Sequence, residues 1–435
     1  MLINSLGLKN FKCFEELDVK FAPITLLTGA NSSGKSSLIN AILAVLQTEQ
    51  FPYFLSPNGQ YANLGSYHEM AKRNSKEEVF EINISFNKTY EINIKSVWMA
   101  ANNDLPFIVS LYFKDTWLEL SYRLEDEVHR VDFKLKFNRF FHETPEEIQK
   151  RLSETDGIVN FTLEHHDTSS VEVSNLLFKY DLHPVDVIYK VEKITGNDIS
   201  EYFRDLKYNG KFDFNYIGSF RLPPSRTYYR QSKPDFKLEV SGEGYVDQII
   251  DWEESESDEY QSLISITSQL GLFQDVKSAK FKSGRFELNV KTHKKSKHVA
   301  LNDVGFGISQ FLPIIVADLQ LSNESCLAVS QPEIHLHPKV QAQFGNYLVN
   351  QIKHTQKQYI IETHSEYLIN RIRLLLVTGE LKPEDVCVLY FENDGIKSTV
   401  HPIEFTTKGA VKGAPQGFFD TYEMDVMDIA MHAIG

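Results

Sequence analysis

Apolar and polar residues alternate over short stretches in the first hundred positions of the chain. Residues 1–20 show this pattern around Leu6, Leu8 and Phe11, and it returns at 79–86 and 90–97. Alternation with a period of two is typical of strands that bury one face. Residues 1–20 therefore predict two strands at the edge of one sheet, and the segments at 79–86 and 90–97 predict an antiparallel layer.

The period changes to that of an amphipathic helix in three places, each directly after a short apolar run. The apolar stripes of these helices are Leu38, Ile39, Ile42, Leu43 and Leu46; Val340, Phe344, Tyr347, Leu348 and Ile352; and Leu368, Ile369, Ile372 and Leu375. Ser365 is the predicted N-cap of the third helix. Strands that alternate with helices predict a parallel sheet, so we expect an α/β fold.

The glycine-rich segment at 24–37, ITLLTGANSSGKSS, fits the phosphate-loop pattern GxxxxGK[ST]. Glycines let the backbone N–H groups close around phosphate oxygens, and the helix that follows directs its positive end at the same place. In this pattern Lys35 reaches the β- and γ-phosphates, and the Ser36 hydroxyl is the predicted Mg²⁺ ligand. The loop residues expected to bind nucleotide are Gly29, Asn31, Ser32, Ser33, Gly34, Lys35, Ser36 and Ser37.

Composition narrows the possibilities further. The 435 residues are 42% hydrophobic, which is enough for one large core or two ordinary ones. A net charge of −14 argues against a broad surface that follows duplex phosphates, although a local basic groove stays open. The single cysteines Cys13, Cys326 and Cys387 show neither disulfide nor metal spacing and are expected to be reduced core residues. Without a signal-like or membrane-spanning apolar run, we expect a cytoplasmic protein with no membrane partner.

Three later segments decide which class of phosphate-loop protein this is. They are, in order, NDVGFGISQFLP at 302–313, CLAVSQPEIHLHP at 326–338 and YIIETHSE at 359–366. Gly305 and Gly307 precede a predicted helix, a second arrangement that suits an anion. His364 follows an apolar strand at its carboxyl end, where parallel sheets bind their ligands.

This order of motifs resembles the ABC-type ATPase heads of the SMC, RecF and OLD kind. It is most similar to small prokaryotic AAA-type ATPases with a C-terminal domain of unknown function. The resemblance implies an ABC-ATPase head with a mixed/parallel sheet core, an antiparallel β layer and an inserted α+β segment. The expected divisions are an N-terminal lobe with the phosphate loop at 1–115, the insertion at 116–211, a C-terminal lobe at 212–380 and a β-containing extension at 381–435.

The resemblance also implies how the site works. ATP and Mg²⁺ would be the cofactors, and two or more copies of the chain would assemble through the nucleotide site. The signature segment of one subunit would complete the γ-phosphate site of another through Gly305, Gly307, Ser309 and Gln310. His364 would be a switch histidine that senses the γ-phosphate, and a separately encoded effector protein would be the partner.

The chain departs from hydrolytic heads of this type at the end of the strand before PEIHLHP. Ser330 and Gln331 stand where a Mg²⁺-ordering acid and a water-polarising glutamate are expected, and neither can act as a general base. Glu333 and Glu362 are the nearest candidate acids. We take Glu333, His364 and Gln331 as the catalytic candidates and expect slow ATP hydrolysis.

Three roles are compatible with these motifs. The first is an ATP-dependent switch that controls an effector, in prokaryotic defence against phage. The second is a RecF-type repair or recombination ATPase that contacts nucleic acid through a basic hairpin with HKKSK at its tip, although a solvated hairpin tip is the preferred interpretation of this segment. The basic residues of the hairpin are Lys277, Lys280, Lys282, Arg285, Lys291, Lys294, Lys295 and Lys297. The third is an OLD-like nuclease that begins at the strand 386–391, which we disfavour because only about forty residues follow.

Two further patterns have ordinary interpretations. The acidic run at 251–259 predicts a solvated loop. His335 and His337 share a strand face in IHLHP and could form a metal pair, but no cysteine or acid stands at ligand spacing, so a loop that faces the second subunit is preferred.

Overall fold

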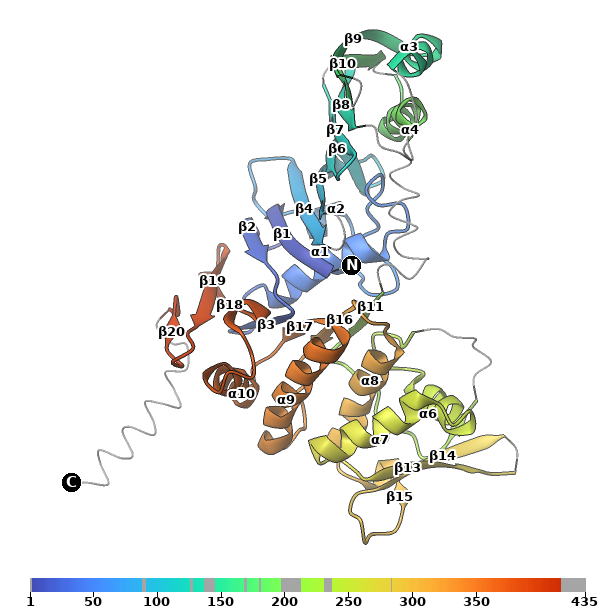
Figure 1. Cartoon of the computed structure of the whole chain (residues 1–435), viewed down its shortest axis with the longest axis vertical. Coiled ribbons are helices and arrows are strands. Elements are labelled where there is room, and N and C mark those ends of the chain that lie inside the picture. Colours follow the sequence, from blue (N-terminus) through green and yellow to red (C-terminus); the bar gives the residue numbers. More distant parts are fainter. Residues whose placement is uncertain are drawn as a thin grey trace, which may run out of the picture. The chain divides into compact units, whose positions relative to one another are not determined.

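The computed structural model describes residues 2–87, 91–125, 128–136, 145–167, 170–179, 181–196, 213–230, 237–282 and 284–415. The chain forms two compact units (Figure 1). Unit 1 contains Met1–Lys20, Ser37–Phe212 and Gly395–Ser398. Unit 2 contains Phe21–Ser36, Asp213–Asp394 and Thr399–Gly435.

Unit 1 is built on a nine-stranded antiparallel sheet with the strand order β2-β1-β4-β5-β6-β7-β8-β10-β9. Its strands are β1 (Leu2–Phe11), β2 (Phe14–Lys20), β4 (Val79–Asn87), β5 (Glu91–Ala100), β6 (Pro106–Lys114), β7 (Leu118–Leu124), β8 (Val128–Lys136), β9 (Ile158–Asp167) and β10 (Ser170–Lys179). The predicted strands at 79–86 and 90–97 are β4 and β5. Strands β7 to β10, which come from the segment expected as an insertion, extend this same sheet.

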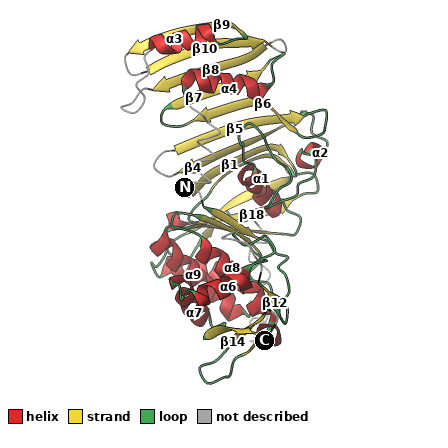
Figure 2. Cartoon of the chain, turned by 90° about the vertical axis from the view of Figure 1, so that its right-hand side faces the viewer, coloured by secondary structure: helices red, strands yellow, loops and turns green. Residues whose placement is uncertain are grey.

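The helices of unit 1 are α2 (Tyr67–Met70), α3 (Pro145–Glu154), α4 (Pro184–Thr195) and most of α1 (Lys35–Gln47). Helices α3 and α4 pack on each other and on β9 and β8, and Figure 2 shows them beside the strands of the sheet. The alternation of buried and exposed residues along β4 and β5 fits a sheet that packs on one face.

Unit 2 contains a seven-stranded sheet with the order β11-β16-β17-β3-β18-β19-β20. Its strands are β3 (Ile24–Gly29), β11 (Phe214–Ile217), β16 (Cys326–Ser330), β17 (Gln358–Glu362), β18 (Val386–Asn393), β19 (Ser398–Phe405) and β20 (Val411–Lys412). The pairs from β11 to β18 are parallel, as predicted. Strands β16 and β17 are buried along their whole length, so the sheet is covered on both faces.

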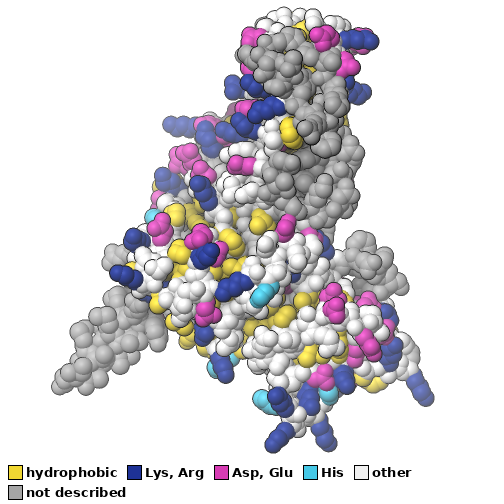
Figure 3. Space-filling view, in the orientation of Figure 1, with side chains coloured by type: hydrophobic (Ala, Val, Ile, Leu, Met, Phe, Trp, Pro, Cys, Tyr) yellow, Lys and Arg dark blue, Asp and Glu magenta, His cyan; other side chains and the backbone are white. Residues whose placement is uncertain are grey.

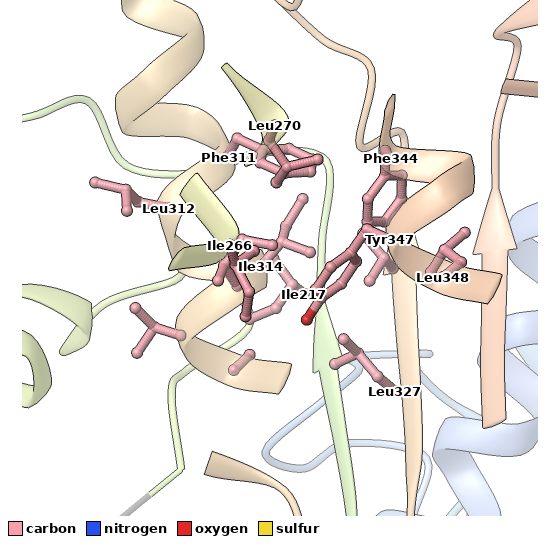
Figure 4. Close-up of a cluster of buried hydrophobic side chains, with 14 of the residues drawn as sticks. Ile217, Ile266, Leu270, Phe311, Leu312, Ile314, Leu327, Phe344, Tyr347 and Leu348 are labelled. Carbon is pink, nitrogen blue, oxygen red and sulfur yellow. The ribbon is translucent and has the colours of Figure 1, made fainter. Parts of the chain in front are cut away.

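The described part of unit 2 also contains five α-helices, and their buried residues share one core with the sheet. They are α6 (Tyr245–Glu254), α7 (Asp258–Leu270), α8 (Phe306–Gln320), α9 (Pro338–Thr355) and α10 (Glu366–Val377), together with the short 3₁₀ turns η1 (Leu301–Asp303) and η2 (Pro383–Asp385). Figure 4 shows Phe311 of α8 facing Phe344 and Tyr347 of α9. The predicted stripe of α10 is buried here, and that of α9 is buried in its middle and partly buried at Val340 and Ile352. Ser365 caps α10 by accepting a hydrogen bond from the Leu368 amide.

A small antiparallel sheet completes unit 2, formed by β12 (Tyr228–Tyr229), β13 (Asp275–Lys280), β14 (Arg285–Lys291) and β15 (Val299–Ala300). The predicted basic hairpin is present as β13 and β14, but HKKSK lies in the next turn, between β14 and β15. Lysine and arginine side chains gather around that turn at the lower end of the view in Figure 3.

Two expectations need correction. The acidic run at 251–259 is not a loop: it ends α6 and begins α7, with Ser257 as the N-cap and Asp258 in the first turn, where a carboxylate suits the helix dipole. The three cysteines are free, but only Cys326 is fully buried, whereas Cys13 and Cys387 are partly exposed. Within the described ranges, no helix is both long enough and apolar enough to cross a bilayer.

Candidate functional site

The phosphate loop joins β3 to α1, as the motif requires. Gly29 and Gly34 have φ values of 128° and 108°, a region in which residues with a side chain are strained. A Cβ atom on Gly29 would lie only 2.2 Å from the carbonyl oxygen of Phe391 on β18. Glycine is therefore required at this position both by the turn and by its neighbouring strand.

Lys35 is 3% exposed and its ammonium is held by the loop itself. Its Nζ donates to the carbonyl oxygens of Gly29, at 3.0 Å, and Ala30, at 2.7 Å. Burial lowers the pKa of this lysine, and the nearby carboxylates of Glu362 and Glu333 oppose that effect. The loop thus keeps a positive charge at the place where phosphate oxygens would bind.

The Ser33 hydroxyl is a second sign that this loop is built to hold a ligand. The residue is 1% exposed, and its Oγ has no hydrogen-bond partner among the described residues. A buried hydroxyl without a partner is costly, and a phosphate oxygen would satisfy it. Asn31 and Ser32 are exposed on the same loop, and Ser37 follows in the first turn of α1.

Ser36 meets a carboxylate from the neighbouring strand. Its Oγ donates to Glu362 Oε1 at 3.1 Å and Oε2 at 3.2 Å. Glu362 is the last residue of β17 and is 6% exposed. A hydroxyl and a carboxylate that meet in this way are oxygen donors of the kind that Mg²⁺ prefers, so these residues fit a magnesium ion.

Ser330 supports Glu362 from the adjacent strand. The two residues pair in the parallel register of β16 and β17, and Ser330 Oγ donates to Glu362 Oε2 at 2.9 Å. The phenol of Tyr216 on β11 lies 3.1 Å from the same Oγ. Ser330 therefore connects Glu362 to β11 and does not bring a charge of its own.

Arg221 fixes the backbone at the end of β16. It is 6% exposed, and its guanidinium donates to the carbonyl oxygen of Gln331 at 2.8 Å. Burial lowers the pKa of Arg221 to about 10. Neither Arg221 nor Tyr216 is among the site residues expected from the sequence motifs. Their only signal was position, since Tyr216 lies on a strand that becomes the neighbour of β16 in the sheet.

Glu333 accepts two hydrogen bonds from the turn that carries His364. Its Oε1 accepts a hydrogen bond from the His364 amide at 2.6 Å, and its Oε2 accepts one from Thr363 Oγ1 at 2.8 Å. Burial raises the pKa of Glu333, although these hydrogen bonds oppose the rise. Both carboxylate oxygens are thus used to hold the backbone and hydroxyl of residues 363–364.

His364 lies at the carboxyl end of β17, as predicted. Partial desolvation of its ring lowers the pKa of His364, and the positive charge of Lys35 lowers it further, while Glu362 has the opposite effect. A lowered pKa keeps the imidazole neutral at pH 7. A neutral ring next to Lys35 can donate one hydrogen bond to a phosphate oxygen and accept another.

The predicted signature segment divides into an exposed and a buried part. Gly305 is the exposed N-cap of α8, whereas Ser309 Oγ donates to the Phe306 carbonyl and Gln310 Nε2 donates to the Leu222 carbonyl inside the same subunit. A Cβ on Gly307 would lie 2.4 Å from the His335 carbonyl oxygen, so close packing explains that glycine.

His335 and His337 are not brought together with other ligands. His335 occupies a turn with a φ of 63°, and His337 is the N-cap of α9. In the part of the chain that the structure describes, no three His, Cys, Asp or Glu side chains form a group that could hold a metal ion by themselves. A magnesium site here would need Ser36 and a nucleotide as well as a single carboxylate.

Fold and site define a phosphate-loop nucleotide-binding protein of the α/β class, with Lys35, Ser36, Glu333, Glu362 and His364 at the carboxyl ends of parallel strands. A family model described as an AAA ATPase domain matches residues 1–222 and 224–369. The chain belongs to this family and is an ATPase, for which a nucleotide and typically Mg²⁺ are the cofactors. A second model, described as a protein of unknown function, matches residues 381–429.

No curated protein matches the sequence. Among solved structures, an SMC head bound to the C-winged helix domain of ScpA is similar with 12% identity and a TM-score of 0.48, over 93% of this chain and 98% of that one. The SMC head domain from Thermotoga maritima is similar with 13% identity and a TM-score of 0.42, over 93% of this chain and 100% of that one. An SMC head with an extended coiled coil, bound to the C-terminal domain of ScpA from Pyrococcus furiosus, is similar with 11% identity and a TM-score of 0.39, over 100% of both chains.

Proposed function

We propose that this chain is an ATP-dependent switch that binds Mg·ATP firmly and hydrolyses it slowly. The observation that carries the proposal is that the two acids near the site, Glu362 and Glu333, are both engaged in hydrogen bonds within the protein. Glu362 lies beside the metal-binding hydroxyl of Ser36, but both oxygens of Glu333 accept hydrogen bonds from residues 363–364. Glu333 is thus engaged by the adjacent turn and Glu362 by Ser36, and we infer that neither acid acts as an efficient general base.

The residues at the strand ends support binding more strongly than chemistry. Lys35 supplies the charge for the β- and γ-phosphates, and Mg²⁺ would neutralise part of the remaining charge there. Gln331 has no basic group, and it lies in a left-handed turn with a φ of 49° whose carbonyl is fixed by Arg221. Without a general base, hydrolysis loses a factor that typically amounts to about 10²–10⁴.

The direct test measures ATP affinity and phosphate release of the purified 435-residue chain. We expect Mg·ATP binding with slow turnover, and Lys35→Ala should abolish binding. Lys339→Ala is the matched control, because Lys339 is exposed on α9. A wild-type turnover of several molecules per second that disappears in Lys35→Ala would contradict the slow-switch proposal, and absent nucleotide affinity would reject it altogether.

We also propose that ATP closes two copies of the head against each other and that this cytoplasmic assembly controls a separate effector, in defence against phage. The exposed Gly305 at the start of α8 supports a second-subunit contact. The effector and the phage setting are supported by the family resemblance alone. Light scattering with and without Mg·ATP tests the assembly, and an unchanged monomer would refute it.

A repair or recombination ATPase is the second candidate, because the turn between β14 and β15 exposes Lys294, Lys295 and Lys297. Neutralising these lysines should weaken DNA binding and reduce its salt dependence if this role is correct. DNA affinity that is absent, or that is unchanged by the triple substitution, would remove this candidate.

A further inference from the structure

We propose that Glu362 on β17 is the carboxylate that holds the Mg²⁺ ion of this site, in place of the acid that is missing at Ser330. This inference rests on the proposed binding of Mg·ATP and names the residue that the metal uses. Three independent features of the site support it.

The first feature is the distance between the two oxygen donors. Mg²⁺ binds its ligands at about 2.0–2.1 Å in octahedral geometry, so two adjacent ligands lie about 2.9 Å apart. Ser36 Oγ lies 3.1 Å from Glu362 Oε1 and 3.2 Å from Oε2. The hydroxyl that the phosphate-loop motif assigns to the metal is therefore one octahedral edge away from this carboxylate.

The second feature is that Ser330 holds only one of the two carboxylate oxygens of Glu362. Oε2 accepts a hydrogen bond from Ser330 Oγ at 2.9 Å, which fixes the rotation of the carboxylate. Among the described contacts, Oε1 meets only the Ser36 hydroxyl. Metal-binding carboxylates are commonly oriented in this way, with one hydrogen bond from a neighbouring side chain.

The third feature is the sheet register. Ser330 and Glu362 are direct neighbours at the ends of parallel strands β16 and β17. An acid moved from the first strand to the second shifts by one interstrand spacing of about 4.8 Å. The hydrogen bonds from Ser36 show that the Glu362 side chain still reaches the phosphate loop from this position. The nearby Glu333 is the poorer candidate, because its two oxygens accept hydrogen bonds from Thr363 Oγ1 and the His364 amide, whereas Glu362 meets Ser36, the expected metal ligand.

Burial makes this placement meaningful. Glu362 is 6% exposed, and the adjacent positive group is Lys35, whose ammonium is held by the loop carbonyls. A buried carboxylate gains most from a divalent cation, since little water is available to solvate it. The serine at position 330 then has a reason to be there: it orients the metal ligand and adds no second charge.

The test uses the 435-residue chain and a fluorescent ATP analogue, with affinity measured in excess EDTA and in Mg²⁺. Wild-type protein should bind more tightly with Mg²⁺. Glu362→Gln should lose at least about tenfold of this enhancement, as expected when metal coordination is disturbed, and should keep its EDTA affinity. Glu366→Gln, with the same charge change four residues away, should keep the full enhancement.

Mn²⁺ provides a readout that is independent of nucleotide affinity. The electron paramagnetic resonance signal of protein-bound Mn·ATP should be present in wild type and Glu366→Gln and should be lost in Glu362→Gln. If Glu362→Gln does not fold, Glu362→Asp withdraws the carboxylate by one methylene and should still reduce the enhancement severalfold.

Two outcomes would overturn this assignment alone: a Glu362→Gln variant with the full Mg²⁺ enhancement and Mn²⁺ signal, or a loss that follows Glu333→Gln instead. A wild-type protein without affinity for the ATP analogue in either condition would overturn the proposed function together with it. The two failures are therefore distinguishable in one set of titrations.

Discussion

Replacing Asp318 by asparagine should destabilise the chain strongly, although the substitution changes little in shape. Asp318 is completely buried on α8, and its carboxylate accepts hydrogen bonds from Tyr347, from Tyr359 at 3.0 Å and from Lys357 at 3.3 Å. The ammonium of Lys357 also donates to the Asp318 carbonyl and is itself buried. The network joins α8, α9 and the start of β17.

The magnitude follows from the charge that the substitution leaves behind. Asp318→Asn keeps an oxygen acceptor for a tyrosine but removes the counter-charge of a buried ammonium. Breaking a buried ion pair in this way costs about 3–5 kcal/mol. For a cooperative unit of about 200 residues, that loss corresponds to roughly 6–20 °C in Tm.

The assay is denaturant and thermal unfolding of both the variant and a matched control. Asp303→Asn makes the same chemical change in an exposed pair, because Asp303 and Arg226 lie 2.9 Å apart with both side chains more than half exposed. Such a pair is worth about 0–1 kcal/mol. If both variants lose the same free energy of unfolding, burial does not strengthen the interactions of Asp318, and the prediction is wrong.

Three other predictions concern the site. Gly307→Ala should disturb the start of α8 and lower stability by roughly 1–3 kcal/mol, because the new Cβ would lie 2.4 Å from the His335 carbonyl, whereas Gly305→Ala has open space and should be tolerated in an unfolding assay. Glu333→Gln offers one acceptor oxygen where the native residue uses two, so the free energy of unfolding should fall by about 1–3 kcal/mol. An unchanged free energy of unfolding would show that the hydrogen bonds from Thr363 and the His364 amide do not stabilise the fold. The pKa of His364 is lowered in the folded state, so the unfolded chain binds the His364 proton first as the pH falls. The contribution of His364 to stability should therefore be present above the usual histidine pKa and decline below it. His364→Gln should lose less unfolding free energy than wild type between pH 7 and pH 5.

Local sequence predicted the elements of the site well. The phosphate loop, the helices after it and after β16 and β17, and the Ser365 cap all depend on interactions within a few residues, such as glycine conformations, helical periodicity and capping hydroxyls. Each of these features depends on residues close to it in the sequence, so the alternation of strands and helices, and hence a parallel sheet, could be predicted. The acidic run at 251–259 was misjudged because charge alone does not distinguish a loop from two capped helix ends.

Contacts between distant segments had to come from the tertiary structure. The sequence by itself predicted Lys35 as a phosphate ligand and Ser36 as a metal ligand, and it determined that Ser330 could not supply an acid. It did not determine that the parallel register would place Glu362 against Ser36, or that Glu333 would be occupied by residues 363–364. Strand register and the direction of a buried side chain depend on packing across the whole sheet, and no single segment contains that information.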